Sequence, residues 1–214
     1  MINSKFRRST KIVATIGTAT NDSKIIKNLI KTGVNVFRLN FSHGNHGDHL
    51  KRISHIRSAE QKMNSNVAIL ADLQGPKFRI GAVKNESKVI KGSDYIFDKD
   101  PGIGDFKRVY LPHDEIFNSL SVGSNILMDD GKLKFKVQDI SHNEIKTEVV
   151  IGGVIKSNKG VNLPGVVLNT SPLTTKDIED LKFILSQEID WIALSFVQKL
   201  KDVQEVKNYI RDKA

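Results

Sequence analysis

The chain has 214 residues, 39% of them hydrophobic, which is enough for one large domain or two small ones with a real core. Lys and Arg number 33 against 24 Asp and Glu, and the net charge of +9 favours polyanions or small phosphorylated ligands. The basic residues are scattered, without an RNA-binding signature or a zinc finger, so we expect no specific nucleic-acid partner. The absence of cysteine excludes disulfides, thiolate metal sites and a cysteine nucleophile.

Membrane and secretion signals are also missing from the sequence. No run of about 18 apolar residues appears, as a membrane span would require. The first residues, "MINSKFRRSTK", lack the apolar stretch of a secretory signal. We therefore expect a cytoplasmic protein with no membrane partner.

Three strands alternate with two helices over the first 75 residues. Strands are predicted at "KIVATIG" (11–17), "VNVFRLN" (34–40) and "VAILADLQG" (67–75). The first helix, 21–33, has a cap-like Asn21/Asp22 and ends at Gly33; the second, 47–63, puts Leu50, Ile53, Ile56 and Met63 on one side. Near-continuous apolar strands that alternate with amphipathic helices predict a parallel sheet buried on both faces.

The pattern changes after Pro76 to short strands separated by turn residues. This all-β insert occupies roughly residues 77–168, and "DDGK" (129–132) predicts a hairpin turn within it. A helical period returns in 174–188, with Ile178, Leu181 and Leu185 on one face. The strand "DWIALSF" (190–196) follows, and then a last helix through Leu200, Val203, Val206 and Ile210.

About four parallel strands result, and the sheet has an unpaired hydrophobic edge if it is meant to close into a barrel. The chain therefore looks unfinished. The alternative is an open, doubly wound α/β sheet that is complete in itself, which the periodicity does not exclude.

The unusual polar residues lie where the predicted strands end, which is where parallel α/β folds bind ligands. They are Arg38, Asn40, Ser42 and His43 after the second strand, Asp72 with Lys77 and Arg79 after the third, Ser195 after the fourth, and Lys159 where the insert returns to the sheet. The arginines and Lys159 suit phosphate or carboxylate, and the oxygen-bearing side chains suit a hard cation.

Plainer explanations stay open for each of these residues. Arg38 in a strand can simply pair with a carboxylate, and Asp72 before a glycine can be a turn residue. Asp129 and Asp130 fit a hairpin turn. The three histidines His46, His49 and His55 look like surface residues of a helix or turn, and their spacing does not form the "HExxH" metal motif.

Read together, seven stretches resemble pyruvate kinases in order and approximate spacing. They are "TKIVATIG", "GVNVFRLNFSHG", "DLQGPKFRIG", "MDDGKLKF", "KGVNLPG", "TTKDIEDLKF" and "DWIALSFVQ", from about residue 9 to the end. The resemblance implies the first half of a (β/α)₈ TIM barrel, residues 1–76 and 169–214, with an inserted all-β lid, residues 77–168. It also implies phosphoryl transfer from phosphoenolpyruvate to ADP, giving pyruvate and ATP.

The resemblance assigns roles to residues of both parts. Arg38 would contact the transferring phosphoryl group, and Pro76 would lie at the lid hinge. The monovalent-cation ligands would be Asn40, Ser42, Asp72 and the backbone carbonyl of Leu73; the nucleotide contacts would be His43, Arg79, Asp130 and Lys159.

Three positions depart from the usual family pattern: Thr18, where proline is common, Gln198, where many members have arginine, and Lys77, where potassium-dependent members carry glutamate. The combination of Lys77 with Leu73 and Gln74 resembles the potassium-independent subgroup, and an ammonium group can replace a monovalent cation. We therefore hypothesise that Lys77 substitutes for K⁺.

The family's lysine for transition-state charge, its Mg²⁺ ligands and its proton-transfer threonine would fall after Ala214, as would the C-terminal domain that forms the family's homotetramer. We expect this chain alone to be a poor catalyst. The alternatives are a non-catalytic half-barrel remnant, a partner-dependent fragment of a split enzyme, and a basic phosphate-binding or nucleic-acid-binding module.

Overall fold

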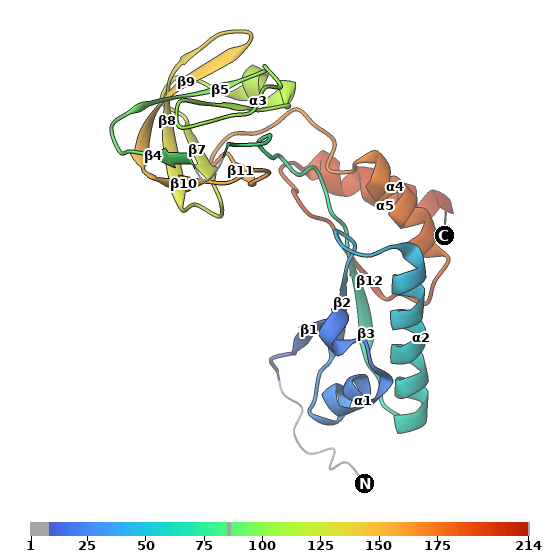
Figure 1. Ribbon diagram of the computed structural model, residues 1–214. Helices are drawn as coiled ribbons and strands as arrows, with labels where there is room; N and C mark the ends of the chain where they lie inside the picture. The colour runs from blue at the N-terminus through green and yellow to red at the C-terminus, as the bar shows by residue number, and fades with distance from the viewer. Residues whose placement is uncertain (1–8, 85–86, 214) are drawn as a thin grey trace. The chain divides into compact units, whose positions relative to one another are not determined.

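The computed structural model describes residues 9–84 and 87–213 and divides into two compact units. We call the unit formed by residues up to Pro76 and from Ser171 onward the barrel unit. The unit from Lys77 to Thr170 is the inserted unit. Figure 1 shows the elements of both units.

The barrel unit alternates strands and helices in the order predicted. Its elements are β1 (Val13–Thr15), the 3₁₀ helix η1 (Thr18–Thr20), α1 (Ser23–Lys31), β2 (Val36–Asn40), α2 (His46–Met63), β3 (Ala68–Asp72), α4 (Thr175–Leu185), β12 (Trp191–Ala193) and α5 (Leu200–Lys213). The four strands are parallel and lie in the order β1-β2-β3-β12. Strands that are sequential neighbours, without a reversal of order, are typical of a barrel wall, and a doubly wound sheet would reverse.

Local sequence explains where the barrel helices begin. The Asp22 side chain accepts hydrogen bonds from the backbone N–H groups of Lys24 and Ile25, so it caps α1 as expected. Asn45 caps α2 and Thr174 caps α4, each with an aspartate three residues later that completes a capping box. The aspartate of the α4 box, Asp177, also accepts a hydrogen bond from the backbone N–H of Gly75 in the loop after β3.

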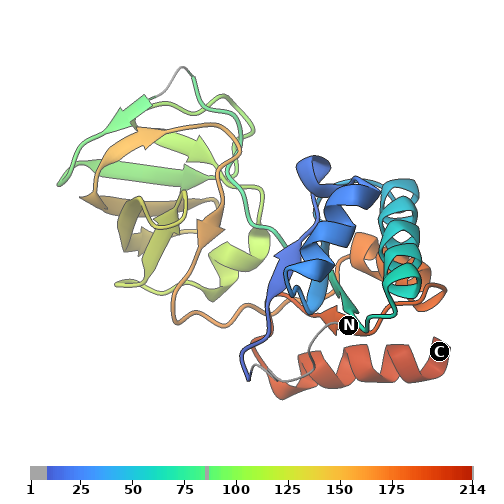
Figure 2. The ribbon, with the colours of Figure 1, turned by 90° about the horizontal axis from the view of Figure 1, so that it is seen from below.

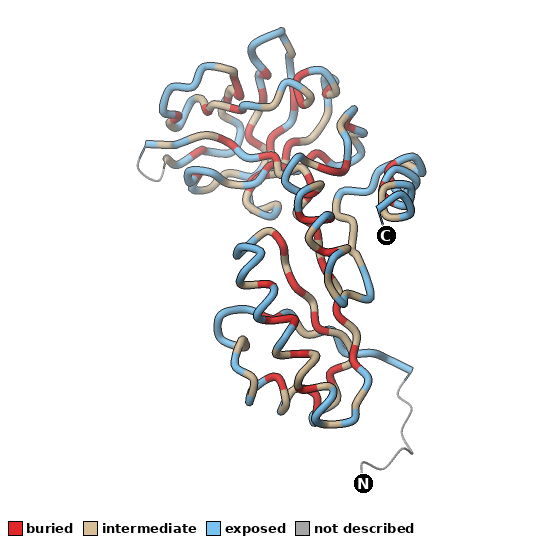
Figure 3. The backbone as a smooth tube through the Cα atoms, turned by 90° about the vertical axis from the view of Figure 1, so that its right-hand side faces the viewer, coloured by how far each residue is buried: buried red, intermediate tan, exposed pale blue. Residues whose placement is uncertain are grey.

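One face of the barrel sheet is buried under helices. Phe37 and Leu39 of β2 and Ile69 and Ala71 of β3 are fully buried. They share a single hydrophobic cluster with residues from α1, α2, α4 and α5, which pack against the sheet (Figure 2). The alternate residues on the same strands are partly exposed, and the burial pattern along the strands is visible in Figure 3.

The expectation of a sheet buried on both faces is therefore wrong for the described chain. Val13 of β1 and Trp191 of β12 are 53% and 63% exposed, although both are large and apolar. Within the described residues each of these strands pairs with one neighbour only. The open face carries the polar residues of the candidate site at the carboxyl ends of its strands.

Several helical positions also differ from the prediction. Leu50 and Leu200, expected on the buried stripes of their helices, are 47% and 75% exposed. His49, expected at the surface, is 1% exposed. The buried faces instead include polar side chains on α2, α4 and α5, because these side chains make hydrogen bonds that the hydrophobic period does not anticipate.

The inserted unit is a β domain with one short helix. Its strands are β4 (Ser87–Val89), β5 (Asp94–Asp98), β6 (Arg108–Tyr110), β7 (Asn125–Met128), β8 (Leu133–Ile140), β9 (Glu144–Ile151), β10 (Gly153–Ile155) and β11 (Val161–Asn162). Six form a sheet in the order β11-β7-β8-β9-β5-β6, and β10 pairs with β4. The helix α3 (Asp114–Ser119) was not anticipated in an all-β insert, since six residues are too short to establish a helical period.

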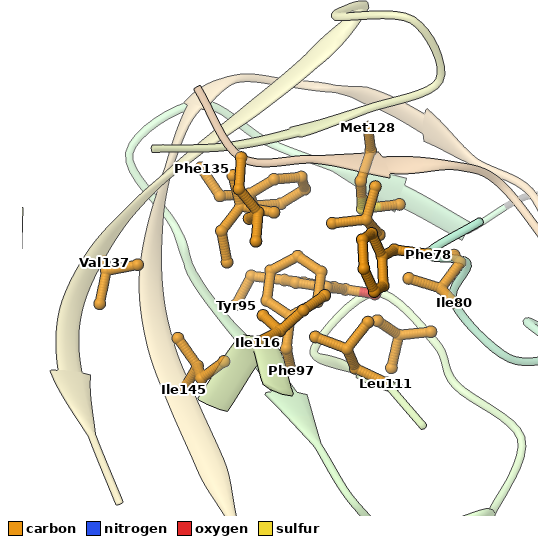
Figure 4. Packing of buried hydrophobic residues seen from close by; sticks show 14 of the residues in the cluster. Phe78, Ile80, Tyr95, Phe97, Leu111, Ile116, Met128, Phe135, Val137 and Ile145 are labelled. Atoms are coloured by element: carbon orange, nitrogen blue, oxygen red, sulfur yellow. The ribbon is translucent and has the colours of Figure 1, made fainter. Parts of the chain in front are cut away.

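Aromatic rings form the centre of the inserted unit (Figure 4). Tyr95, Phe97 and Phe135 are fully buried and lie 5.1–5.4 Å apart between ring centroids. Burial raises the pKa of the Tyr95 hydroxyl, which donates a hydrogen bond to the backbone of Asp105. The Phe97 ring contacts the other two rings edge-on, and such contacts stabilise the core beyond the burial of apolar area. The unit therefore has its own core, separate from that of the barrel unit.

Candidate active site

The side chain of Arg38 links the ends of three strands in the barrel unit. Its Nε donates a 2.8 Å hydrogen bond to Oδ2 of Asp72 on β3, and Nη2 pairs with the same oxygen. Its Nη1 donates a 3.0 Å hydrogen bond to Oγ1 of Thr15 on β1. Arg38 is thus paired with a carboxylate, as one of the sequence explanations holds, and its side chain keeps a 32% exposed fraction at the open face.

Oxygen atoms gather around Asp72. Asn40 is the direct neighbour of Asp72 across the β2–β3 pair, and its Oδ1 accepts a hydrogen bond of 3.0 Å from the backbone N–H of Ser42. The hydroxyl of Ser195 lies 3.3 Å from Asp72 Oδ1 and 3.0 Å from the carbonyl oxygen of Leu73. Carboxylate, amide, hydroxyl and carbonyl oxygens are the ligands of hard cations, so the donor set fits a monovalent cation.

The loop after β2 is held by histidines. His43 is exposed, but its carbonyl oxygen lies 3.1 Å from Nε2 of His49, whose ring stacks on Phe41 at 4.0 Å. The pKa of His49 is lowered mainly by burial and, to a smaller extent, by the positive charge of the nearby Arg52. His46 is exposed, as expected, and its ring contacts Asp180. His55 is partly exposed, and its Nδ1 lies 2.9 Å from the carbonyl of Asn21.

Two of the three candidate nucleotide residues of the inserted unit, Arg79 and Lys159, lie on adjacent backbone segments. Arg79 forms an antiparallel bridge with Gly160, and the backbone N–H of Ile80 donates to the carbonyl of Lys159. The Arg79 guanidinium donates a 2.7 Å hydrogen bond to the carbonyl of Asn158. This arrangement brings Arg79 and Lys159 to the same corner of the unit.

His113 fixes the backbone of Arg79. Its Nε2 accepts a 2.9 Å hydrogen bond from the Arg79 N–H, while Nδ1 lies 3.7 Å from the carboxylate of Glu115. Nε2 also lies 3.1 Å from the carbonyl oxygen of Arg79, so the ring contacts both backbone polar groups of that residue. Burial lowers the pKa of His113, which favours the neutral ring.

The hairpin turn between β7 and β8 supplies the partner of Lys159. Asp129, Asp130 and Gly131 all have positive φ, of 50°, 58° and 85°, so "DDGK" is the turn predicted from the sequence. Asp130 is exposed, and it is Asp129 that pairs with the ammonium of Lys159 at 2.7 Å. Lys159 and, to a smaller extent, Lys132 lower the pKa of Asp129.

A cavity of about 450 Å³ lies beside this ion pair. Its lining includes Asp129, Lys132, Lys156, Lys159 and the backbone of Gly152 and Gly153. Three lysines against one carboxylate give the cavity a positive charge. It therefore suits a phosphorylated anion.

The described part of the chain lacks a cluster of candidate ligands for a divalent metal ion. Residues 9–84 and 87–213 contain no group of three or more histidine, cysteine, aspartate or glutamate side chains that could hold a metal ion. These residues therefore form no Mg²⁺ site built from three or more such protein ligands. The same residues contain no helix long and apolar enough to cross a membrane.

Sequence reasoning missed the residues of α4 that contact the site loops. Lys176 donates to the carbonyl of Phe41, and Asp177 accepts from the N–H of Gly75. The capping-box spacing of Thr174 and Asp177 was readable from the sequence. Their contacts to loops about 100 or more positions away in the chain were not, because they depend on the packing of α4 against β2 and β3.

A wall of parallel βα units with polar strand ends, interrupted by a β domain, defines a βα-barrel protein with an inserted domain. The family model "Pyruvate kinase, barrel domain" matches residues 7–214. The chain therefore belongs to the pyruvate kinase family.

Individual relatives agree with this assignment. A pyruvate kinase of Agrobacterium vitis is 42% identical over 210 residues, which cover 97% of this chain and 44% of the relative. A pyruvate kinase of Methylorubrum extorquens is 43% identical, over 98% of this chain and 44% of the relative. A crystal structure of a pyruvate kinase from Cryptosporidium parvum superposes with a TM-score of 0.90 at 32% identity, covering 95% of this chain and 42% of that chain. The chain thus spans less than half the length of these relatives.

Proposed function

We propose that this chain carries the phosphoenolpyruvate-binding and nucleotide-binding half-sites of a cytoplasmic pyruvate kinase, which transfers a phosphoryl group from phosphoenolpyruvate to ADP and yields pyruvate and ATP. The observation that supports this most directly is the Arg38 guanidinium at the strand ends, oriented by Asp72 and Thr15. Phosphoryl transfer depends mainly on positioning and charge neutralisation, and a planar arginine held in one orientation supplies both.

In the barrel unit, Arg38 binds the phosphoryl group of phosphoenolpyruvate. Asn40, Ser42, Asp72 and the carbonyl of Leu73 hold a monovalent cation beside it. The register that places Asn40 opposite Asp72 supports this role, since it sets two of the four oxygen ligands next to each other.

In the inserted unit, Arg79 and Lys159 bind the phosphates of the nucleotide, and Asp130 faces the ligand. His43, from the barrel unit, is the remaining nucleotide contact. The support within the inserted unit is the backbone bridge that joins the Arg79 and Lys159 segments, together with the lysine-lined cavity beside them. The ligand would replace Asp129 as the partner of Lys159.

Potassium dependence is weak or absent because Lys77 supplies the required positive charge. One monovalent charge at one place is sufficient for this role. When the Lys77→Glu variant is mixed with the rest of a family member, activity should then require added K⁺, and unchanged activity in potassium-free buffer would contradict the idea. Mg²⁺, the family's divalent cofactor, is held by protein residues other than those described in this chain.

The decisive test is a coupled assay with phosphoenolpyruvate, ADP and Mg²⁺. The chain is assayed alone and mixed with a separately produced segment that covers the rest of a family member. We expect little turnover from the chain alone and activity from the mixture. Calorimetric titration should detect ADP binding to the chain alone, and a folded chain that binds neither ADP nor phosphoenolpyruvate would refute the proposal.

A second candidate function is that of a partner-dependent component, which binds its ligands only after a further chain covers its open sheet face. The exposed Val13 and Trp191, on the two outer strands, favour it. Ligand binding that appears only in the mixture would support this alternative. The family's homotetramer would then form from assembled barrels.

A further inference from the structure

The first turn of α4 is stabilised by more than an ordinary helix cap. Oγ1 of Thr174 accepts a 3.1 Å hydrogen bond from the N–H of Asp177, and Oδ2 of Asp177 accepts from both the N–H and the hydroxyl of Thr174, at 2.9 and 2.5 Å. These bonds use one carboxylate oxygen of Asp177. Its other oxygen remains for a partner outside the helix.

That partner is the loop after β3. Oδ1 of Asp177 accepts a 3.1 Å hydrogen bond from the backbone N–H of Gly75, and Asp177 is fully buried. A buried carboxylate needs such partners because burial without them is costly. Gly75 follows Asp72 and Leu73 closely in the chain, so this bond restrains the segment that carries two of the proposed cation ligands.

The neighbouring residue Lys176 holds the loop after β2. Its Nζ donates a 2.8 Å hydrogen bond to the carbonyl of Phe41, which lies between Asn40 and Ser42 in the sequence. The same Nζ pairs with Oδ2 of Asp180 at 2.6 Å. The ammonium group therefore connects α4 directly to the backbone of the second site loop.

Asp180 fixes the position of that ammonium group. Its side chain is 4% exposed, and its Oδ1 lies 2.8 Å from Nε2 of His46. The His46 ring in turn stacks on Phe183 of α4, with 4.4 Å between ring centroids and 5° between ring planes. Both oxygens of Asp180 are thus used to orient groups that touch the loop between β2 and α2.

We propose that Lys176, Asp177 and Asp180 form a clamp that sets the backbone positions of the two loops after β2 and β3, and through them the substrate and cation ligands of the barrel unit. They are positioning residues, since they act through the carbonyl of Phe41 and the N–H of Gly75. A loop already held in its binding geometry loses less freedom when it binds a ligand, so the clamp raises affinity. The inference rests on the proposed function for the identity of the ligand.

The test uses the full chain with Lys176→Met, and Lys182→Met as the matched control on the same helix. Lys182 is exposed, so its loss removes a similar charge without touching either site loop. Phosphoenolpyruvate and ADP are titrated separately by calorimetry. Lys176→Met should weaken phosphoenolpyruvate binding about tenfold, the size expected when a hydrogen bond to a charged group is lost. ADP binding should weaken less than phosphoenolpyruvate binding, because Arg79 and Lys159 lie in the inserted unit and only His43, among the proposed nucleotide contacts, lies on the clamped loop.

A second measurement is independent of any ligand. Amide hydrogen exchange at Ser42 and His43 should be faster in Lys176→Met than in Lys182→Met. Exchange at Gly75 should be faster in Asp177→Asn than in the unmodified chain. Lys176→Arg, which retains a charged donor, should recover most of the affinity and of the protection. Equal unfolding midpoints of the two methionine variants would show that the effect is local.

The results separate the clamp from the proposed function. If the unmodified chain binds no phosphoenolpyruvate, the proposed role of the barrel unit fails, and the exchange data alone decide on the clamp. Faster exchange at Ser42 then upholds the clamp, and equal exchange overturns it. If the unmodified chain binds phosphoenolpyruvate, equal affinity of the Lys176→Met and Lys182→Met variants overturns the clamp. A loss of affinity in Lys176→Met without faster amide exchange also overturns the clamp, since Lys176 would then act directly on the ligand.

Discussion

Each unit of the molecule contains an arginine bound to an aspartate, and the two pairs differ in what they connect. In the inserted unit, Arg108 on β6 pairs with Asp98 on β5 and donates a further 2.6 Å hydrogen bond to the carbonyl of Asp100. The hydrogen bond to Asp98 raises the pKa of Arg108. All these partners lie within ten positions of the arginine, so the pair closes a local loop.

In the barrel unit, Arg38 and Asp72 come from strands 34 positions apart and meet at the carboxyl ends of β2 and β3. Neighbouring oxygen donors from Asn40 and Ser195 surround the pair. The chemistry of the two ion pairs is the same, but only the second lies where a parallel sheet binds ligands. Location relative to the strand ends, more than the pairing itself, distinguishes a candidate functional arginine from a structural one.

The largest expected effect comes from Arg38→Met. It should weaken phosphoenolpyruvate binding about 100-fold, since it removes charged hydrogen bonds to the phosphoryl group worth about 1.5–3 kcal/mol each. Calorimetric titration measures the loss. Arg108→Met is the matched control: it should lower the free energy of unfolding by about 1–3 kcal/mol, by urea denaturation, because Asp98 is left unpaired, and it should leave binding unchanged. Weaker phosphoenolpyruvate binding by Arg108→Met would show that Arg108 is not a purely structural residue.

Gly75→Ala should destabilise the barrel unit by about 2–3 kcal/mol, more than Gly92→Ala destabilises the inserted unit. Both glycines have positive φ, 65° and 82°. A Cβ on Gly75 would lie 2.5 Å from the ring of Phe196, whereas a Cβ on Gly92 would meet nothing within 4 Å. Urea denaturation of the two variants separates the clash from the backbone strain, which costs about 1–2 kcal/mol alone. Equal losses would show that Phe196 moves aside.

Lys159→Met should weaken ADP binding about tenfold with little change in stability, because its pair with Asp129 is at the surface and such pairs contribute about 0–1 kcal/mol. Titration with ADP and thermal unfolding measure the two effects. Lys134→Met, also a lysine of the inserted unit, serves as the control. A large loss of stability would place Lys159 with Arg108 as a structural residue.

The smallest expected effect is on the pH dependence of stability. The pKa values of His49 and His113 are lowered in the folded chain, so the unfolded chain binds more protons below the ordinary value of about 6.5. Each histidine contributes its full stability above that pH and loses it as the pH falls toward its folded pKa, with a slope of at most about 1.4 kcal/mol per pH unit. His113→Gln should flatten the acid side of the profile in urea denaturation; an unchanged profile would contradict this.

Much of the fold followed from patterns within single elements. The β-branched runs around Val13, Phe37 and Ile69 predicted the parallel strands, and Asp22 predicted the start of α1. The turn at Asp129 was readable because consecutive residues there must adopt positive φ. The short helix α3 was missed because six residues do not establish a helical period. The exposure of Leu50 was missed because the buried face of α2 includes the polar side chain of His49.

The candidate site was predictable in its residue types and less so in its contacts. The motif around Arg38 and Asn40 indicated that polar groups gather at a strand end. Two contacts were not predictable: Asp129 rather than Asp130 pairs with Lys159, and His49 is buried. Both depend on the direction in which each side chain points after the chain has packed.

The sequence by itself determined the order of strands and helices in the barrel unit and the family to which the chain belongs, because these follow from local propensity and from motifs of neighbouring residues. Only the tertiary structure decided that Asp72 orients Arg38, that Ser195 reaches the carbonyl of Leu73, and that α4 holds both site loops. These contacts join residues 34 to 135 positions apart, and the packing of helices on the sheet is what brings such distant groups within hydrogen-bonding distance.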